Sequence, residues 1–116
     1  MKLTKRQVKP GIVVLELEGR ISMGNDCAQI DQEVQQHIQR DEKRVIFDLT
    51  GVNHIDSAVV GQIVKSHSTL RRSGGKLRLA GVSTMVYGVL KMTMVDKVIE
   101  IFPTAQDAAK GFPRPQ

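Results

Sequence analysis

The stretch that decides the fold is Phe47 to Gly61, FDLTGVNHIDSAVVG. It continues an apolar run, Val45 to Leu49, which is rich in β-branched residues and closed by Thr50-Gly51. Such a run predicts a central strand covered on both faces. From Val59 onward the apolar residues recur at helical spacing and indicate a helix with a core-facing stripe. The stretch therefore predicts a buried strand, a loop, and a helix that opens at Asp56-Ser57.

Ser57 lies at the exposed edge of the predicted apolar stripe. With a step of about 100° per residue, Gly61 lies about 40° and Val64 about 20° from it around the helix axis. Asp56 or Ser57 is a natural N-cap, because a short side-chain oxygen accepts a hydrogen bond from the free amides of a first helical turn. From the residues alone, the serine is either a helix cap or an exposed hydroxyl at a helix start.

The rest of the chain alternates predicted strands and helices. The expected strands are Leu3 to Val8, Ile12 to Glu18, Val45 to Leu49, Leu77 to Ala80 and Val98 to Ile101. The expected helices run from the capping pair Asn25-Asp26 to about Arg40, from Ser57 to about Ser73, from Ser83 or Thr84 through Leu90, and from Thr104 onward. Pro10-Gly11 is expected to join the first two strands as a hairpin. This alternation predicts a mixed sheet flanked by helices.

The length of 116 residues and the 41% hydrophobic composition suit one domain. We expect an α/β domain over residues 1–110, with a mixed β-sheet of four to five strands and about four α-helices. Residues 111–116 contain two prolines and no apolar period, and we expect them to form a flexible tail.

The segment Leu49 to Gly61 resembles the signature loop of the STAS domain found in bacterial anti-sigma-factor antagonists. In that family a strand ends in Asp-Leu, and a few residues later an Asp-Ser pair opens the next helix. Leu17 to Ile21 resembles the family's segment after its second strand, and Gly74 to Leu77 resembles its Gly-Gly turn. The resemblance covers roughly Leu3 to Ala109, and it implies a STAS-like fold.

The resemblance also implies a function. In the family the serine is phosphorylated by a partner kinase that is itself the anti-sigma factor, and by position the target here is Ser57. We expect a non-enzymatic regulatory protein that binds an anti-sigma factor/serine kinase and is switched off by phosphorylation of Ser57, with a phosphatase acting on the same residue. The expected partner-binding residues are Asp56, Ser57, Ala58, Gly61 and Val64, with Ser22 and Met23 in a neighbouring loop.

Val59 departs from the family pattern, which usually has glycine at this position. We expect its side chain to crowd the surface beside Ser57. This feature favours an alternative function, a constitutive STAS adaptor subunit of a larger transport or signalling complex in which Ser57 is only a helix cap.

The net charge of +5 and the pI near 9.7 raise nucleic acid or an anionic membrane as a partner. The cationic residues are spread from Lys2 to Arg114, however, and the chain has only three Phe, one Tyr and no Trp for base stacking. We therefore expect no direct binding of nucleic acid. No apolar run reaches the roughly 18 residues of a membrane span, and no signal region follows the charged N-terminal segment. We expect no membrane insertion and a cytoplasmic location, which the lone Cys27 also fits.

Catalytic and metal sites are not expected. His54, Asp56 and Ser57 are residue types of a hydrolytic triad, but they lie within one tetrapeptide, where the required hydrogen bonds are rarely formed together. His37, His54 and His67 show no metal-ligand spacing. No phosphate-binding or dinucleotide-binding glycine motif occurs, so we expect no cofactor.

Overall fold

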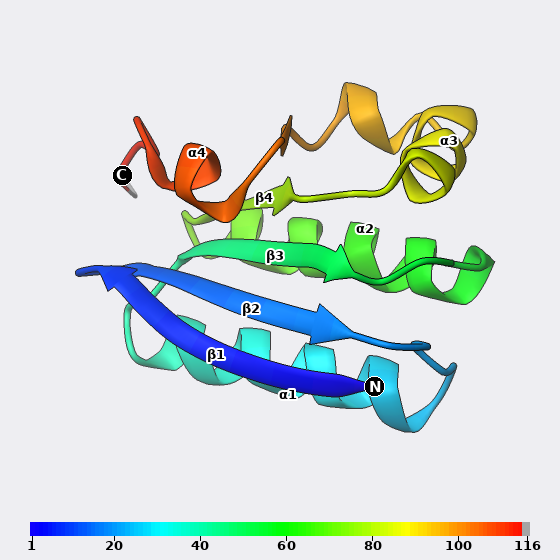
Figure 1. Ribbon diagram of the computed structural model, residues 1–116. Helices are drawn as coiled ribbons and strands as arrows, with labels where there is room; N and C mark the ends of the chain where they lie inside the picture. The colour runs from blue at the N-terminus through cyan, green and yellow to red at the C-terminus, as the bar shows by residue number, and fades with distance from the viewer. Residues whose placement is uncertain (115–116) are drawn as a thin grey trace.

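The computed structural model describes residues 1–114, and over them the chain forms a mixed five-stranded sheet with four α-helices (Figure 1). The strands are β1 (Lys2–Lys9), β2 (Ile12–Glu18), β3 (Arg44–Gly51), β4 (Lys76–Ala80) and β5 (Ile101–Phe102). The helices are α1 (Asn25–Gln39), α2 (Ser57–Arg72), α3 (Thr84–Met92) and α4 (Ala105–Ala109), with a 3-10 helix η1 (Val95–Lys97). The strand order is β1-β2-β3-β4-β5; β1 is antiparallel to β2 and all other pairs are parallel. The predicted fold class is confirmed.

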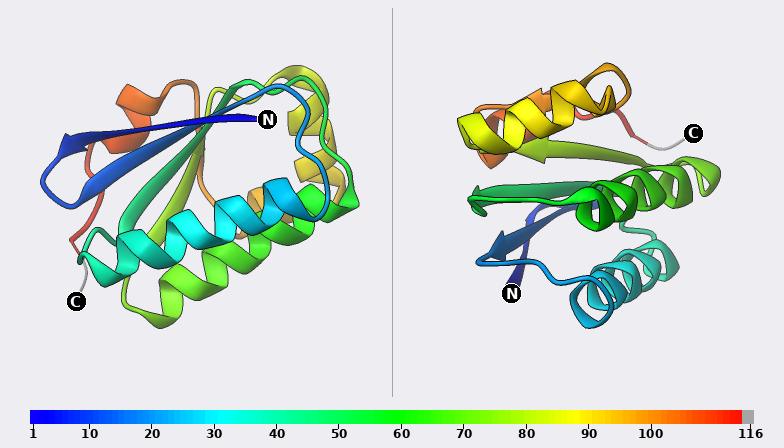
Figure 2. Two further views of the ribbon diagram at one scale, coloured as in Figure 1. Left: turned by 90° about the horizontal axis from the view of Figure 1, so that it is seen from below. Right: turned by 90° about the vertical axis from the view of Figure 1, so that its right-hand side faces the viewer.

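Helices cover both faces of the sheet. Helices α1 and α2 lie side by side on one face, and α4 lies on the other (Figure 2). The central strand β3 supplies both cores, because successive side chains of a strand point to opposite faces. Val45, Phe47 and Leu49 pack in the larger core with α1 and α2, whereas Ile46 packs in the smaller core with α4. The buried middle of β3 fixes the position of the loop that follows it.

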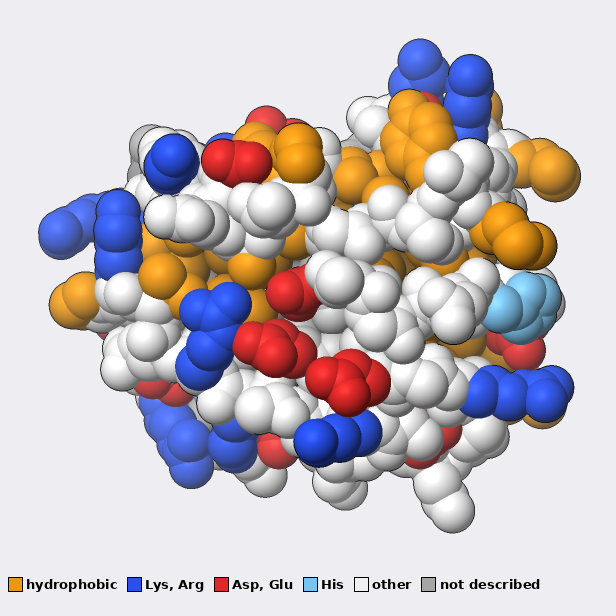
Figure 3. Space-filling model, in the orientation of Figure 1, with side chains coloured by type: hydrophobic (Ala, Val, Ile, Leu, Met, Phe, Trp, Pro, Cys, Tyr) orange, Lys and Arg blue, Asp and Glu red, His pale blue; other side chains and the backbone are white. Residues whose placement is uncertain are grey.

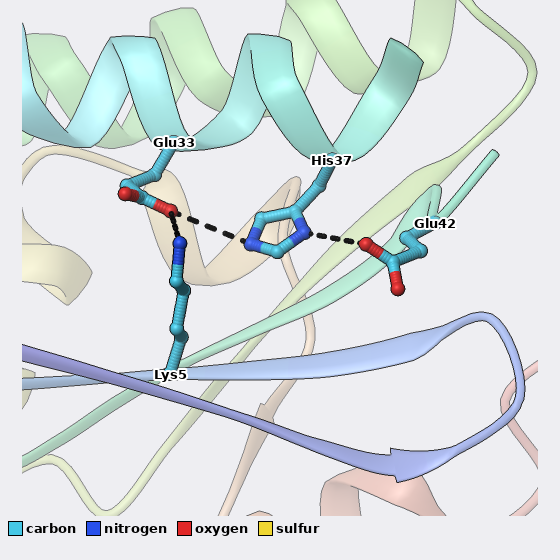
Figure 4. A network of polar contacts seen from close by, with 4 residues as sticks. All are labelled: Lys5, Glu33, His37 and Glu42. Atoms are coloured by element: carbon cyan, nitrogen blue, oxygen red, sulfur yellow. Dashed lines mark hydrogen bonds and ion pairs between the residues drawn. The ribbon is translucent and has the colours of Figure 1, made fainter. Parts of the chain in front are cut away.

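The polar contacts of α1 tie it to the edge strand and to the loop before β3 (Figure 4). Lys5 of β1 donates to Glu33 of α1 over 3.3 Å. Nδ1 of the buried His37 lies 2.9 Å from a carboxylate oxygen of Glu42, and its Nε2 lies 3.6 Å from Glu33. These contacts hold the C-terminal half of α1 in place under the sheet.

The packed part of the chain extends further toward the C-terminus than the sequence predicted. Phe112 is only 5% exposed and belongs to the smaller core. The guanidinium of the buried Arg78 lies 4.5 Å from the ring centre of Phe112 and 4.8 Å from that of Phe102, and it donates to the carbonyl oxygens of Ala108 and Lys110. Packing therefore continues to Phe112, two residues past the expected domain limit at residue 110, and the limit itself stays a prediction. Residues 115 and 116 of the expected tail lie outside the described residues, and its flexibility stays a prediction.

The strand expected at Val98 to Ile101 forms only from Ile101, because the chain before it is still completing a helical turn. Val95 and Ile99 are both buried, and the Ile99 amide donates to the Val95 carbonyl oxygen, so the chain makes a helical turn through η1. Val98 is 60% exposed on the outside of this turn. The apolar residues are therefore four apart on one side of a turn, and only Ile101–Phe102 pairs with β4 as a strand.

Candidate functional site

The loop between β3 and α2 is anchored by two buried apolar side chains. Val52 is fully buried and Ile55 is 3% exposed, while Asn53 and His54 between them are exposed. The Val52 amide donates to the Leu49 carbonyl oxygen over 2.9 Å, which makes a tight turn directly after the strand. The loop therefore presents the start of α2 at the surface in a fixed position.

Asp56, and not Ser57, caps helix α2. The Asp56 side chain accepts a hydrogen bond of 3.0 Å from the Val59 amide, and its backbone is extended as an N-cap requires. Ser57 is the first helical residue and is exposed, and no hydrogen bond to its hydroxyl is formed by any residue in the range 1–114. The predicted helix start is confirmed, but the idea that Ser57 serves as the cap is wrong.

Val59 does not crowd the surface beside Ser57. Its side chain is 1% exposed and belongs to the larger core. Two residues along a helix correspond to a rotation of about 200°, so Val59 lies on the side of α2 opposite to Ser57. The expectation of crowding is wrong. Val59 therefore no longer favours the adaptor function.

A flat strip runs along α2 from Ser57. Gly61, one turn on, is exposed, and apart from its chain neighbours and the backbone of α2 itself, no atom lies within 4 Å of where a side chain would start. Val64, a further turn on, is 42% exposed, and Ala58 beside the serine is half-buried. This strip leaves a protein partner free access to the Ser57 hydroxyl, although the binding role of these residues stays a prediction.

The loop between β2 and α1 lies next to the Ser57 loop. The ends of the parallel strands β2 and β3 are joined there by a hydrogen bond of 2.9 Å from the Gly19 amide to the Gly51 carbonyl oxygen. Ser22 and Met23 in this loop are both exposed, Met23 at 76%. The two segments predicted to bind a partner are therefore brought to the same edge of the sheet.

Asp26 fixes the conformation of this neighbouring loop. The backbone amide and the hydroxyl of Ser22 donate to its carboxylate over 2.7 and 2.8 Å, and both hydrogen bonds lower the pKa of Asp26 below its ordinary value. Asp26 is therefore not part of a capping pair, and the N-cap of α1 is Gly24. Burial, together with the charges of Asp56 and Asp26, raises the pKa of the Cys27 thiol.

A hollow of about 380 Å³ lies between the two loops, and sequence reasoning missed it. It is lined by Gly19, Arg20, Gly51, Asn53 and His54. These residues follow the ends of β2 and β3, and ligands of parallel sheets bind at this edge. That rule was the signal available in the sequence, since each of the five residues comes directly after a predicted strand or in the loop that follows it.

The same region shows no catalytic geometry. Over residues 1–114, no hydrogen bond joins His54, Asp56 and Ser57 to one another, and the Asp56 carboxylate is occupied by the Val59 amide. No cluster of three or more His, Cys, Asp or Glu side chains that could hold a metal ion occurs in this part of the chain. Among the described helices, none has the length and apolar composition needed to cross a membrane.

The STAS domain family model matches residues 4–108, which includes both loops and the start of α2. The chain belongs to the STAS domain family. Its sequence is 28% identical over 105 residues to BtrV of Bordetella bronchiseptica, whose name describes it as a candidate anti-sigma factor antagonist. The match covers 90% of this chain and 86% of BtrV.

Solved structures share the fold of this STAS domain. Protein TM1081 of Thermotoga maritima superposes with a TM-score of 0.85 at 21% identity, over 97% of this chain and 89% of that one. The anti-sigma factor antagonist SpoIIAA, in its unphosphorylated form, gives 0.79 at 19% identity over 92% of each chain. A sulfate transporter family protein of Wolinella succinogenes gives 0.71 at 18% identity over 89% and 85% of the two chains.

Proposed function

We propose that this STAS protein is an anti-sigma factor antagonist that binds an anti-sigma factor/serine kinase and is switched off by phosphorylation of Ser57. The observation that carries the proposal is the Ser57 hydroxyl, which is exposed, free of hydrogen bonds among the described residues, and placed beside a flat strip of α2. The protein itself acts without catalysis and without a cofactor in the cytoplasm. The kinase supplies the nucleotide, and a phosphatase acting on Ser57 resets the switch.

The geometry of the helix start suits a kinase substrate. A transferred phosphoryl group needs an approach in line with the attacking oxygen, and an exposed hydroxyl at the first position of a helix offers it. Because Asp56 already caps the helix, phosphorylation of Ser57 removes no hydrogen bond that α2 depends on. Modification is therefore compatible with an intact fold.

The phosphate would change binding far more than stability. It adds a charge of about −1.5 to −2 at pH 7. The free amides and the dipole of α2 favour this charge by about 0.3 to 1 kcal/mol, and the neighbouring Asp56 opposes it. Docking a partner onto Ser57 would strip water from the phosphate, and a buried charge without a matching cation costs several kcal/mol. A loss of about 3 kcal/mol already reduces affinity more than a hundredfold.

A constitutive adaptor subunit is the second candidate function. It is favoured by the similar fold of the sulfate transporter family protein. In an adaptor, Ser57 would be an ordinary exposed residue, and the partner would bind equally well whatever its modification.

Mass spectrometry after incubation with ATP and the purified kinase separates the two functions. We expect one phosphate on Ser57, an affinity for the kinase that is lower by more than about a hundredfold, and an unchanged melting temperature on the same phosphorylated sample. No phosphate on Ser57, or an affinity retained after phosphorylation, would contradict the switch. A large fall in melting temperature would contradict the account of how it works.

A further inference from the structure

Large exposed apolar side chains are concentrated on α3 and the segment that follows it. Met85 is 70% exposed, Met92 82%, Met94 60% and Val98 60%. We call these four residues the methionine surface. Figure 3 shows hydrophobic side chains gathered at the upper right, over α3. Contiguous exposed apolar side chains on a small protein mark an interaction site more often than chance, and methionine adapts to the shape of a partner.

The local structure turns these side chains outward. Met85 and Met92 are seven residues apart, which places them about 20° from each other around α3. Val86 and Leu90, on the other side, are fully buried. Met94 takes a left-handed backbone conformation, with φ of 66°, which ends the helix and starts η1. The exposure of the methionine surface therefore follows from a core that is already filled by its neighbours.

The methionine surface is bordered by positive charge. Lys91 and Lys97 lie within the same segment and form no ion pair with any described residue, unlike Lys76, which pairs with Glu100 over 2.8 Å. The single acidic residue between positions 84 and 99 is Asp96, which is half-buried. The chemistry complementary to this surface is an apolar segment bordered by aspartate or glutamate.

The start of α3, with Met85, lies at the edge of the sheet that carries Ser57, and the other three residues of the methionine surface follow along α3 and past its end. Helix α3 follows β4, the parallel neighbour of β3, so it starts at the same edge of the sheet as α2. Figure 2 shows α3, α2 and α1 arranged in a row at this end of the molecule, with α2 in the middle. A partner that docks over Ser57 and is larger than this domain would meet α3 as well.

We propose that the anti-sigma factor/kinase contacts the methionine surface as a second docking area, through an apolar segment bordered by carboxylates. This inference rests on the proposed function. A second copy of the chain fits less well, since a symmetric contact would set two surfaces that are both bordered by lysine against each other. An anionic bilayer also fits less well, because two lysines strengthen binding there by only about thirtyfold in total.

The test measures the affinity of the purified kinase that phosphorylates the wild-type protein. Met92→Glu with Met94→Glu should lower this affinity about tenfold or more, since hot-spot apolar contacts are replaced by charges that repel the partner's carboxylates. Val8→Glu is the matched control, because Val8 is 37% exposed and lies near the end of β1. The turn from β1 to β2 is at the opposite end of the sheet from α3 (Figure 1). The control should leave the affinity within about twofold.

Two further sets of variants test the inference, one that reverses the lysine charges and one that shortens the methionine side chains to alanine. Lys91→Glu with Lys97→Glu should weaken binding by severalfold, and Lys9→Glu at the end of β1 should not. If the first glutamate pair lowers the melting temperature, Met92→Ala with Met94→Ala replaces it and should lower affinity by severalfold.

Equal affinity of the folded methionine variants and the wild type would overturn the inference alone, while the proposed function would stand. No phosphorylation of the wild type by any candidate kinase would instead contradict the proposed function. Two further outcomes would also overturn the inference, each in methionine variants that retain kinase affinity. Loss of binding to phosphatidylserine vesicles would assign the surface to a membrane. Loss of dimerisation in ultracentrifugation would assign it to a second copy.

Discussion

Helices α2 and α3 begin in the same way. The residues Asp56 to Gly61 read DSAVVG and the residues Ser83 to Gly88 read STMVYG. In each, a polar side chain caps the helix by accepting from the amide three residues on, over 3.0 Å in α2 and 3.2 Å in α3. A hydroxyl residue follows the cap, the capped amide belongs to a buried valine, and the motif closes with an exposed glycine.

The two helix starts differ in what surrounds the hydroxyl. Next to Ser57 stands the half-buried Ala58, and the loop of Ser22 and Met23 lies beside it. Next to Thr84 stands Met85, which is 70% exposed. An exposed hydroxyl at a capped helix start is therefore common to both sites, and only the neighbourhood separates a phosphorylation site from an ordinary first turn.

Removing each hydroxyl gives the largest expected difference. Ser57→Ala should abolish phosphorylation by the kinase while leaving binding intact, because the change removes the acceptor oxygen without adding bulk. Thr84→Ala should leave phosphorylation unchanged, which mass spectrometry of both variants would show. If the alanine variant at position 57 still takes up one phosphate, or the variant at 84 loses it, the assignment of Ser57 is incorrect.

Replacing the buried valine should destabilise the protein by a similar amount in both helices. The difference between α2 and α3 should therefore be smaller here than the difference in phosphorylation. Val59→Gly and Val86→Gly each remove three carbon atoms from the core and add the helix penalty of glycine, so each should lower the free energy of unfolding by roughly 3 kcal/mol. Val64→Gly, at a position 42% exposed on α2, is the control and should cost about 1 kcal/mol. Urea denaturation measures all three. A small loss for Val59→Gly, with faster phosphorylation, would restore the idea that Val59 crowds the serine.

Removing each cap should have the smallest effect. Asp56→Ala and Ser83→Ala should each lower the free energy of unfolding by about 1 kcal/mol. Ser57→Ala should cost less than about 0.5 kcal/mol, since Ser57 caps nothing and alanine favours a helix. Thermal unfolding of the three variants checks the order. A larger loss for Ser57→Ala than for Asp56→Ala would show that the serine is the cap in solution.

Much of the fold could be predicted because β3 and α2 have strong apolar periods. The run Val45 to Leu49 is fully buried apart from Asp48, and the stripe of α2 faces the core as expected. The errors arose where burial depends on distant residues. Phe112 follows a glycine and precedes prolines, which is typical of a tail, yet Arg78 from β4 and the small core hold it.

The candidate site could be predicted in part. The exposure of Ser57 followed from the helical step, since it lies at the edge of the apolar stripe. The choice of Asp56 as the cap could not be made from sequence, because both side chains are good caps and the choice depends on where the buried Ile55 fixes the loop. The orientation of Val59 follows from the same helical step, which puts it about 200° from Ser57, on the core side of α2. The expectation of crowding came instead from the resemblance to the family pattern.

The position of Phe112 matters when the domain is moved into another protein. The family match ends at residue 108, so a fragment cut there would keep all five strands but lose the Phe112 ring and the Lys110 carbonyl oxygen that hold Arg78. Arg78, only 6% exposed in the intact fold, would keep Glu100 and the Ala108 carbonyl oxygen as partners of its guanidinium. Removing partners of a buried charge lowers the stability of the fold. A graft of this domain into a fusion protein therefore has to carry the chain through residue 112.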